Sequence, residues 1–151
     1  MIKLLLVTAL TLAPQEPNNG WALTQPPAPA GWPKRPDDDW LLARTAALTR
    51  IFRVDDHSVS LSNGLVQRTW RVDPHMACIA FDDLTRGEAL LRAVEPEARI
   101  AVDGNVLDVG GLHGQPDRAY LRPEWLETLQ PRADALHFRS LRPEAIATRV
   151  P

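Results

Sequence analysis

The chain has 151 residues, 44% of them hydrophobic and 24% charged, which fits one globular domain and excludes a wholly disordered chain. Its formal net charge of -2 supplies neither a basic stripe for nucleic acid nor a polybasic patch for a membrane surface. A single cysteine, Cys78, excludes an intrachain disulfide. No CxxC pair or Cys/His cluster is present, so we expect no metal and no cofactor.

Residues 1–22 have the pattern of a secretory signal peptide. Lys3 gives a positive start, and residues 4–13 form an apolar run that is too short for a membrane helix of about 20 residues. Cleavage can follow Ala13 or Ala22, and the second is favoured because the first leaves a very short signal. This pattern predicts a secreted or periplasmic protein, free of the membrane after cleavage. The alternative is a cytosolic protein with a disordered or helical N-terminus.

Residues 23–36 are rich in proline, which fixes φ and removes a backbone donor. They are expected to form an extended, unpaired and mobile linker. The folded domain is then expected over residues 37–151, with a domain that is incomplete at its C-terminus as the alternative. Its first part is ambiguous, because Asp37–Asp39 can cap a short helix while residues 45–54 also fit a strand.

From Ser58 onward the pattern predicts short strands. Residues 58–62 alternate with period two, Asn63-Gly64 follows, and residues 65–72 come next, which predicts a hairpin with a type I′ turn. Residues 76–81 are apolar on both faces and predict a central strand. A second hairpin is expected over 98–109 around Asp103-Gly104, with four of its side chains facing the core: Ile100, Val102, Leu107 and Val109.

After this hairpin, residues 110–116 predict a flexible loop, and Pro123–Leu129 predict one or two helical turns with Trp125, Leu126 and Leu129 on the apolar side. Residues 136–141 return to period two. Together these signals predict a mainly β fold, an antiparallel β-sandwich with short helical segments.

No complete catalytic site is expected in this chain. Glycosidases need two opposed carboxylates, and the four best candidates, Asp82, Asp83, Glu88 and Glu124, are better explained as turn formers and solvated charges. Serines on the strands lack the GxSxG pattern of a nucleophile. We therefore expect no catalytic residue among them.

Other candidates for chemistry also favour structural roles. The histidines, His57, His75, His113 and His137, lack the spacing of a metal site. Gly110-Gly111-Leu112-His113-Gly114 lacks the pattern of a phosphate-binding loop and favours a hinge. Cys78 lies in an apolar run and is expected to be a small buried core residue.

The five tryptophans are the most informative side chains, because an exposed indole can stack on a sugar ring. Trp70 and Trp125 fall in register with apolar neighbours and are expected in the core. Trp21 is expected to leave with the signal peptide. Trp32 and Trp40 flank the linker, which makes them the candidate carbohydrate contacts.

Several segments together resemble the N-terminal β-sandwich domain of secreted bacterial glycoside hydrolases of the α-galactosidase (melibiase) type. The resemblance covers roughly residues 58–126. It is carried by SNGLVQRTW at 62–70, LTRGEALLR at 84–92, GGL at 110–112 followed by Gln115, AYL at 119–121 and PEWL at 123–126.

In that family the sandwich precedes a (β/α)₈ barrel, and the catalytic aspartates belong to the barrel. The resemblance thus implies that this chain is the leading part of a longer protein and has no catalytic position of its own. It favours a non-catalytic accessory domain that packs against a glycosidase domain and shapes its cleft. Two alternatives stay open: a stand-alone carbohydrate-binding module, and a small glycoside hydrolase. The expected partners are a carbohydrate or a glycosidase catalytic domain.

Overall fold

The structure is a computed structural model that describes residues 20–32, 42, 49–136 and 138. Several expectations from the sequence lie outside these residues: the apolar run of the signal peptide, the helix cap at 37–39, Trp40, His137 and most of the strand expected over 136–141.

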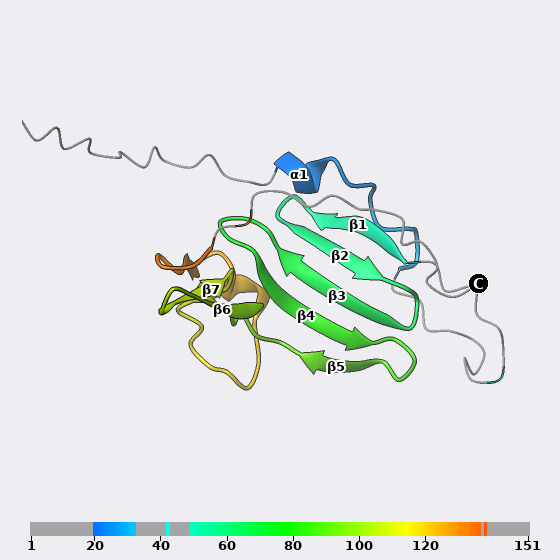
Figure 1. Ribbon diagram of the computed structural model, residues 1–151. Helices are drawn as coiled ribbons and strands as arrows, with labels where there is room; N and C mark the ends of the chain where they lie inside the picture. Colours follow the sequence, from blue (N-terminus) through cyan, green and yellow to red (C-terminus); the bar gives the residue numbers. More distant parts are fainter. Residues whose placement is uncertain (1–19, 33–41, 43–48, 137, 139–151) are drawn as a thin grey trace, which may run out of the picture.

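A five-stranded antiparallel sheet, with strands in sequence order, forms the body of the domain (Figure 1). Its strands are β1 (Arg50–Asp55), β2 (Ser58–Ser62), β3 (Val66–Arg71), β4 (Ala77–Asp83) and β5 (Glu88–Leu91). The expectation that the apolar strand after Pro74 is central is confirmed, because β4 lies between β3 and β5. β-branched and aromatic residues in these strands fit the pleated surface of a sheet.

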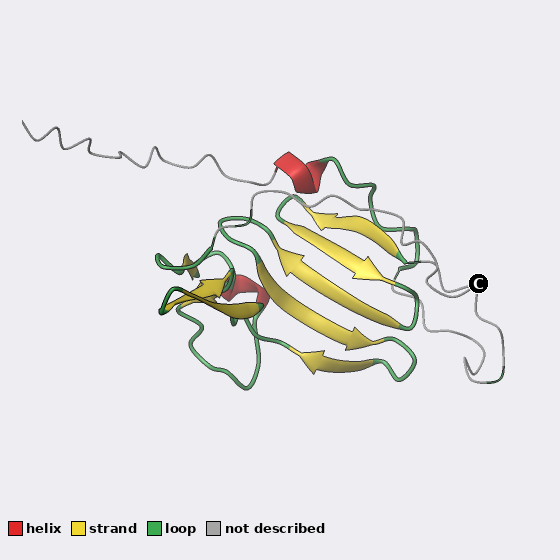
Figure 2. Ribbon diagram, in the orientation of Figure 1, coloured by secondary structure: helices red, strands yellow, loops and turns green. Residues whose placement is uncertain are grey.

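Two small antiparallel ladders and two short helical segments complete the described chain (Figure 2). The ladders pair β6 (Ala98–Val102) with β7 (Asn105–Val109), and β8 (Leu112–His113) with β9 (Gln130–Pro131). The helical segments are α1 (Gly20–Leu23) and the 3₁₀ turn η1 (Pro123–Trp125). The expected mainly β fold with antiparallel sheets is confirmed. Within the described residues no helix has the length and apolarity that crossing a membrane requires.

The two predicted hairpins form, but only one has the predicted turn. In the β6–β7 hairpin, Asp103 and Gly104 both have positive φ, 49° and 80°, as a type I′ turn demands. In the β2–β3 hairpin only Gly64 has positive φ, 86°, so the type I′ prediction is wrong there. Instead the Asn63 carboxamide oxygen accepts hydrogen bonds from the amides of Leu65 and Val66, at 2.9 and 3.0 Å, which stabilises a longer loop.

Apolar side chains gather in two clusters on the sheet. One contains Ala77 of β4 with Val94, Leu112 and Leu129, so the segments after β5 pack against β4. The other contains Ala22, Val59 and Val72, with Trp70 and Phe138 packed against it. Trp70 and Trp125, both expected in the core, are each half-buried. Trp70 packs against the second cluster, and Trp125 lies against Tyr120 with ring centroids 5.3 Å apart.

The serines of β2 are buried as completely as its valine. Ser58, Ser60 and Ser62 are each at most 3% exposed. Ser60 shares a hydrogen bond with Thr69 across the ladder at 2.6 Å, and the Ser62 hydroxyl donates to the Val66 carbonyl at 2.8 Å. These bonds offset the cost of removing hydroxyl groups from water, so β2 is covered on both faces.

Residues 26–28, part of the unpaired linker expected over residues 23–36, are paired with β1, which corrects the expectation for this stretch; residues 33–36 lie outside the described residues. The Ala28 amide donates to the Arg53 carbonyl at 3.1 Å, and the Arg53 amide donates to the Pro26 carbonyl at 2.7 Å. Residues 26–28 therefore lie parallel to β1 along its outer edge. Proline suits this position because it cannot donate to a further strand, so it closes the edge.

The β6–β7 hairpin is far more exposed than the sequence predicts. Ile100 and Val102 were expected to face the core, yet they are 42% and 50% exposed. Leu107 and Val109 are partly buried. The alternation in both strands sets which side chains share a face. The hairpin pairs with no strand of the five-stranded sheet, and at its base Val109 forms a bridge with Leu136.

The glycine-rich segment after β7 is a fixed junction, which corrects the expectation of a flexible hinge. Gly110 and Gly111 are buried. The Gly111 amide donates to the Met76 carbonyl at 2.7 Å, and the Gly110 amide donates to the Leu136 carbonyl at 3.2 Å. A Cβ at Gly110 would stand 2.2 Å from the Met76 oxygen, so a side chain has no room there. These amides are engaged within the fold and are not presented to a phosphate.

Replacing Gly110 with alanine should destabilise the domain more than the same change at Gly87. Both residues have positive φ, which costs a residue with a Cβ roughly 1–2 kcal/mol. Only Gly110 adds a steric clash, expected at about 1–3 kcal/mol, since nothing lies within 4 Å of a Cβ at Gly87. Urea unfolding of Gly110→Ala and Gly87→Ala measures the difference, and equal unfolding midpoints would contradict a close-packed junction.

The buried position of Ala22 makes the two signal-cleavage sites distinguishable. Ala22 is 0% exposed and packs with Val59 and Val72, so a cut after Ala22 removes this contact, whereas a cut after Ala13 keeps it. We expect chains beginning at Pro14 and at Gly20 to have the same melting temperature. A chain beginning at Leu23 should be less stable by about 1 kcal/mol or more. Three equal melting temperatures would show that α1 contributes nothing.

Candidate functional site

A hollow of about 270 Å³ lies beside the β1–β2 end of the large sheet. We call it the Trp32 hollow. It is lined by Pro29, Trp32, Arg50, Phe52, Ser62, Asn63 and Gly64. Arg50 and Phe52 are two residues apart on β1 and therefore point to the same face, and Arg50 is the register partner of Ser62 on β2. The hollow thus combines two aromatic rings with the polar groups of Arg50 on β1 and of the loop between β2 and β3.

Trp32 reaches this face because the segment before it runs along β1 and then turns. The Trp32 amide donates to the Pro29 carbonyl at 3.1 Å, with Gly31 between them at a φ of 77°. The indole Nε1–H donates to the Gln67 carboxamide oxygen at 2.5 Å. The indole also meets Phe52 at 5.3 Å between centroids and an angle of 74°. Trp32 is half-buried and fixed at both its polar and its apolar side.

Asn63 presents one end of its carboxamide to the β2–β3 loop and keeps the other available. Its oxygen accepts from the amides of Leu65 and Val66. In the described part of the chain its Nδ2 group has no hydrogen-bond acceptor. A primary amide nitrogen supplies two N–H donors, so Asn63 adds donor capacity to the wall of the hollow.

Arg50 differs from the other described arginines in its lack of a partner. Nine arginines each have a carboxylate within 4.0 Å: Arg53, Arg68, Arg71, Arg86, Arg92, Arg99, Arg118, Arg122 and Arg132. Arg50 has neither an ion pair nor a side-chain hydrogen bond within residues 20–32, 42, 49–136 and 138. Its guanidinium, with five N–H donors and a permanent charge, is the unused cation of the hollow.

The acidic residues singled out in the sequence are engaged in local structure. Asp82 accepts from Arg92 at 2.6 Å across the β4–β5 pair. Asp83 caps the following turn, and the hydrogen bond from the Thr85 hydroxyl lowers the pKa of its carboxyl. Glu88 and Glu124 lie 3.8 and 3.7 Å from neighbouring arginines. The structure does not bring these four together as an opposed pair across a cleft.

The histidines are spread over the domain. His57 meets Asp73 at 3.2 Å, His75 is 2% exposed, and His113 is exposed on β8. Among the described residues no group of three or more His, Cys, Asp and Glu side chains is arranged to hold a metal ion.

Cys78 is buried, at 4% exposure, as the sequence predicts. It has a basic neighbour that the sequence did not reveal, because the Arg68 Nε–H donates to the Cys78 Sγ at 3.4 Å. Burial nevertheless raises the pKa of the Cys78 thiol, against the opposing effect of Arg68. A protonated and inaccessible thiol is a poor nucleophile, so Cys78 is a structural residue.

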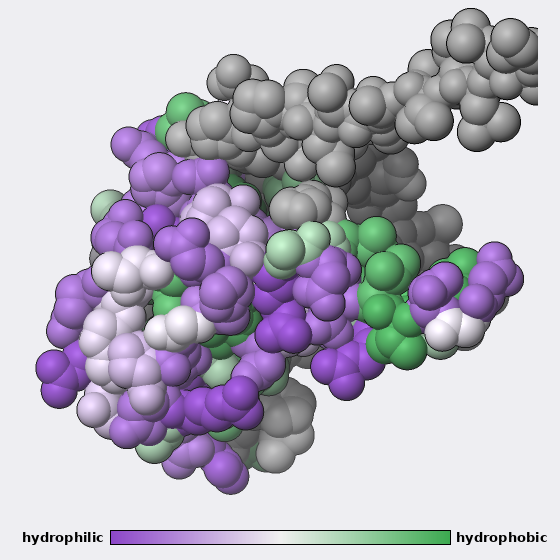
Figure 3. All heavy atoms as spheres, turned by 90° about the vertical axis from the view of Figure 1, so that its left-hand side faces the viewer, coloured by the Kyte–Doolittle hydropathy of each residue, from purple (hydrophilic) through white to green (hydrophobic). Residues whose placement is uncertain are grey.

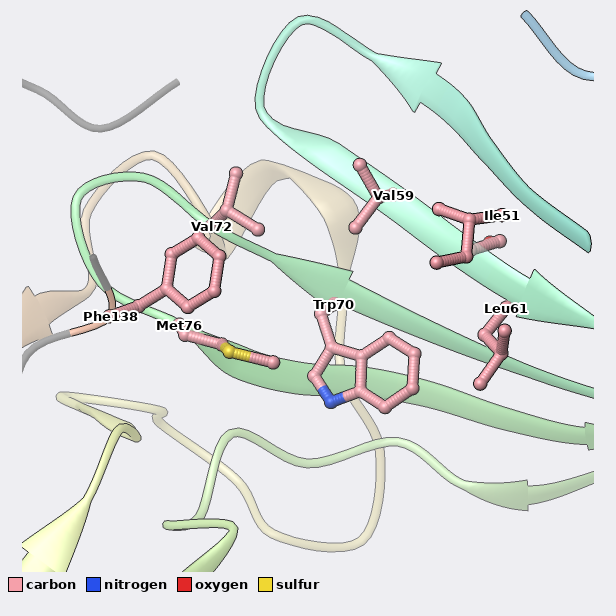
Figure 4. A pocket seen from close by; sticks show the side chains of 8 residues that line it. Ile51, Val59, Leu61, Trp70, Val72, Met76 and Phe138 are labelled. Atoms are coloured by element: carbon pink, nitrogen blue, oxygen red, sulfur yellow. The ribbon is translucent and has the colours of Figure 1, made fainter. Parts of the chain in front are cut away.

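A second cavity on the opposite face is apolar and too small for a sugar. It measures about 60 Å³ and is lined by side chains that Figure 4 shows converging from β1, β2, β3 and the segments beyond. The labelled residues are Ile51, Val59, Leu61, Trp70, Val72, Met76 and Phe138. An engineered apolar cavity that holds benzene measures about 150 Å³, so this one is a packing gap.

The other notable surface is the β6–β7 hairpin, whose base is held by Asp108. Its carboxylate, 8% exposed, accepts from the Arg99 Nε at 2.8 Å and from Arg132 at 3.0 Å. The hydrogen bond from Arg99 lowers the pKa of the Asp108 carboxyl. Figure 3 views the molecule from the side on which Figure 1 places β6 and β7, and hydrophobic residues reach the surface there among hydrophilic ones.

Comparisons of the chain with protein-family models, with curated proteins and with solved structures find no match. No relative therefore assigns a role to any residue. The resemblance to the sandwich domain of glycoside hydrolases stays a prediction, and the site has to be argued from its own geometry.

Of the two predicted carbohydrate contacts, Trp32 lines the hollow and Trp40 lies outside the described residues. Sequence reasoning missed Arg50, Phe52 and Asn63 as lining residues. The hairpin register, once assumed, places Arg50 opposite Ser62 and so beside Asn63. The approach of Trp32 to Phe52 had no signal, because nothing in a proline-rich stretch specifies which strand it will follow.

The Asp108 ion pairs give the domain a specific acid sensitivity. Because the pKa of Asp108 is lower in the folded than in the unfolded state, its contribution is present above the unfolded value of about 3.9 and is lost as the pH falls through the folded value. Asp108→Asn should therefore unfold at lower urea than the parent at pH 7, and this gap should close towards pH 3.

Asp103→Asn is the matched control, because Asp103 is exposed in the turn, where asparagine tolerates positive φ. Its effect should be small at every pH. A gap for Asp108→Asn that is the same at pH 7 and pH 3 would contradict the stabilising role of the carboxylate.

Proposed function

We propose that this chain is a non-catalytic accessory β domain of a secreted or periplasmic carbohydrate-active protein, and that it docks against a glycosidase catalytic domain through the β6–β7 hairpin. The observation that carries the proposal is the exposure of Ile100, Val102 and Val106, at 42%, 50% and 60%. The choice of partner is supported by the resemblance to sandwich domains that precede a glycosidase barrel.

An isolated two-stranded hairpin is at best marginally stable in water. Register pairing puts Ile100 opposite Leu107 on one face of this hairpin and Ala101 opposite Val106 on the other, so both faces carry apolar side chains. A hairpin of this kind normally gains its stability by packing against another element. In the described chain its ordered attachment is at the base, through Asp108.

A second exposed apolar segment is β5, the strand that precedes the hairpin in the chain. Every residue of β5 is exposed, including Leu90 at 53% and Leu91 at 39%. β5 is also the edge of the five-stranded sheet, so its outer backbone groups have no strand partner within the described residues. Exposed apolar residues next to an open edge are typical of a surface that another domain covers.

The proposal assigns turnover to the partner. Asp83 caps a turn, and the other three acids singled out in the sequence, Asp82, Glu88 and Glu124, lie against arginines, so these four do not oppose one another across a sugar-sized cleft. A second role, carbohydrate binding by the chain itself, is supported by the Trp32 hollow, and it is compatible with docking because hollow and hairpin involve different strands.

Association with a separately produced glycosidase domain tests the docking role. We expect the same protein to include such a domain, and the two pieces to form a complex in isothermal titration calorimetry. Val102→Lys should weaken the complex by at least about tenfold, because it buries an unpaired charge.

Val54→Lys is the control, since Val54 has the same 50% exposure but lies on β1, away from the hairpin. It should leave the affinity within about twofold, as surface substitutions do. Absence of a complex with the glycosidase domain, or equal losses for the two variants, would refute docking through β6–β7.

A further inference from the structure

We propose that the Trp32 hollow binds a sugar ring that carries a carboxylate, such as a uronic acid residue. The inference takes its ligand class from four properties of the hollow: its size, its free cation, its excess of hydrogen-bond donors and its aromatic walls. It rests on the proposed carbohydrate-active role only for the biological source of such a sugar, and it can be tested without the docking partner.

The size of the hollow limits the ligand to about one ring. Ligand pockets commonly measure about 300–1,000 Å³, and the hollow, at about 270 Å³, lies just below the small end of that range. Its residues come from the turn at Pro29–Trp32, from β1 and from the β2–β3 loop, and all three are held by backbone hydrogen bonds. The hollow is therefore formed before any ligand arrives.

Arg50 is the feature that calls for a negative charge. Arg50 lines the hollow, and no described carboxylate neutralises its guanidinium, although nine other described arginines are each paired. Guanidinium binds carboxylate through two parallel N–H···O bonds, which are stronger than bonds between neutral groups. A carboxylate on the ligand would complete the pairing that the chain itself leaves open.

The neighbouring polar groups also donate. Asn63 offers its Nδ2 hydrogens, since its oxygen is engaged by Leu65 and Val66. Ser62 already donates to the Val66 carbonyl and accepts from the Gly64 amide. A neutral sugar hydroxyl needs acceptors as well as donors, whereas a carboxylate only accepts, so this set favours the acid.

The aromatic walls call for a ring rather than a bare anion. Trp32 and Phe52 meet at 74°, and because Phe52 is only 3% exposed, the half-buried indole of Trp32 is the main apolar wall of the hollow. The indole N–H of Trp32 is taken by Gln67, so the indole meets a ligand chiefly with carbon atoms. The C–H face of a pyranose ring packs well on such a surface, as other flat apolar faces do.

The test is a titration of the purified chain with three small probes. D-glucuronate carries both ring and carboxylate, D-glucose carries the same ring with a neutral group, and acetate carries the carboxylate alone. We expect D-glucuronate to bind with a dissociation constant of about 1 mM or tighter by calorimetry and by amide chemical shifts at Asn63 and Gly64, with weaker binding at high salt. D-glucose and acetate should bind at least about tenfold more weakly.

Two substitutions test the residues without disturbing the fold. Arg50→Gln removes the cation, and Asn63→Asp keeps the oxygen that holds the loop while replacing the N–H donors with negative charge. Each should weaken D-glucuronate binding at least about tenfold. Arg53→Gln is the matched control, since Arg53 lies on the same strand, faces the other side and pairs with Asp56.

The inference is overturned if D-glucuronate does not bind, if acetate binds equally well, or if Arg50→Gln and Arg53→Gln have the same effect. Circular dichroism of each variant confirms that the fold is kept. Failure here leaves docking untouched, because docking is measured on Val102 with no sugar present. Loss of docking with intact D-glucuronate binding would in turn remove only the accessory role.

Discussion

The close approach of two backbone segments at Gly110 and Gly111 determines the shape of this domain. The Gly111 amide donates to the Met76 carbonyl just before β4. A Cβ at Gly110 would stand 2.2 Å from the same oxygen, so a side chain has no room at Gly110. This contact brings Leu112 over Ala77 and so closes the apolar cluster on β4. Because Gly110 directly follows β7, the contact also fixes the position of the β6–β7 hairpin relative to β4.

Several charged side chains of the domain form ion pairs within the fold. Arg68 meets Glu97 at 2.7 Å, Arg71 meets Glu127 at 3.1 Å, and Asp108 joins two arginines at the base of the hairpin. Arg71 and Asp108 are buried, and a buried charge is costly unless it is paired, so the contacts of these two side chains serve the fold. The two proposals concern the exposed apolar hairpin and Arg50, which has no carboxylate partner within the described residues.

The sequence predicts local structure well where the pattern is itself local. Both hairpins, the central strand and the short turn at Pro123 follow from period two, from Asn-Gly and Asp-Gly pairs and from proline at a helix start. The predictions failed where partners are distant. Alternation shows that Ile100 and Val102 share a face, but whether a sheet covers that face depends on the direction taken at Gly110. Likewise the proline-rich segment has no pattern that reveals its pairing with β1.

The central claim is that the hairpin is built to be covered by a second domain, and amide hydrogen exchange tests it most directly. In the isolated chain the β6 and β7 amides should exchange much faster than those of β3 and β4, because only their own ladder protects them. Adding the glycosidase domain should slow exchange in β6 and β7 and leave β1 and β2 unchanged. Protection of β6 and β7 equal to that of β4 in the isolated chain, or unchanged on addition of the domain, would contradict the claim.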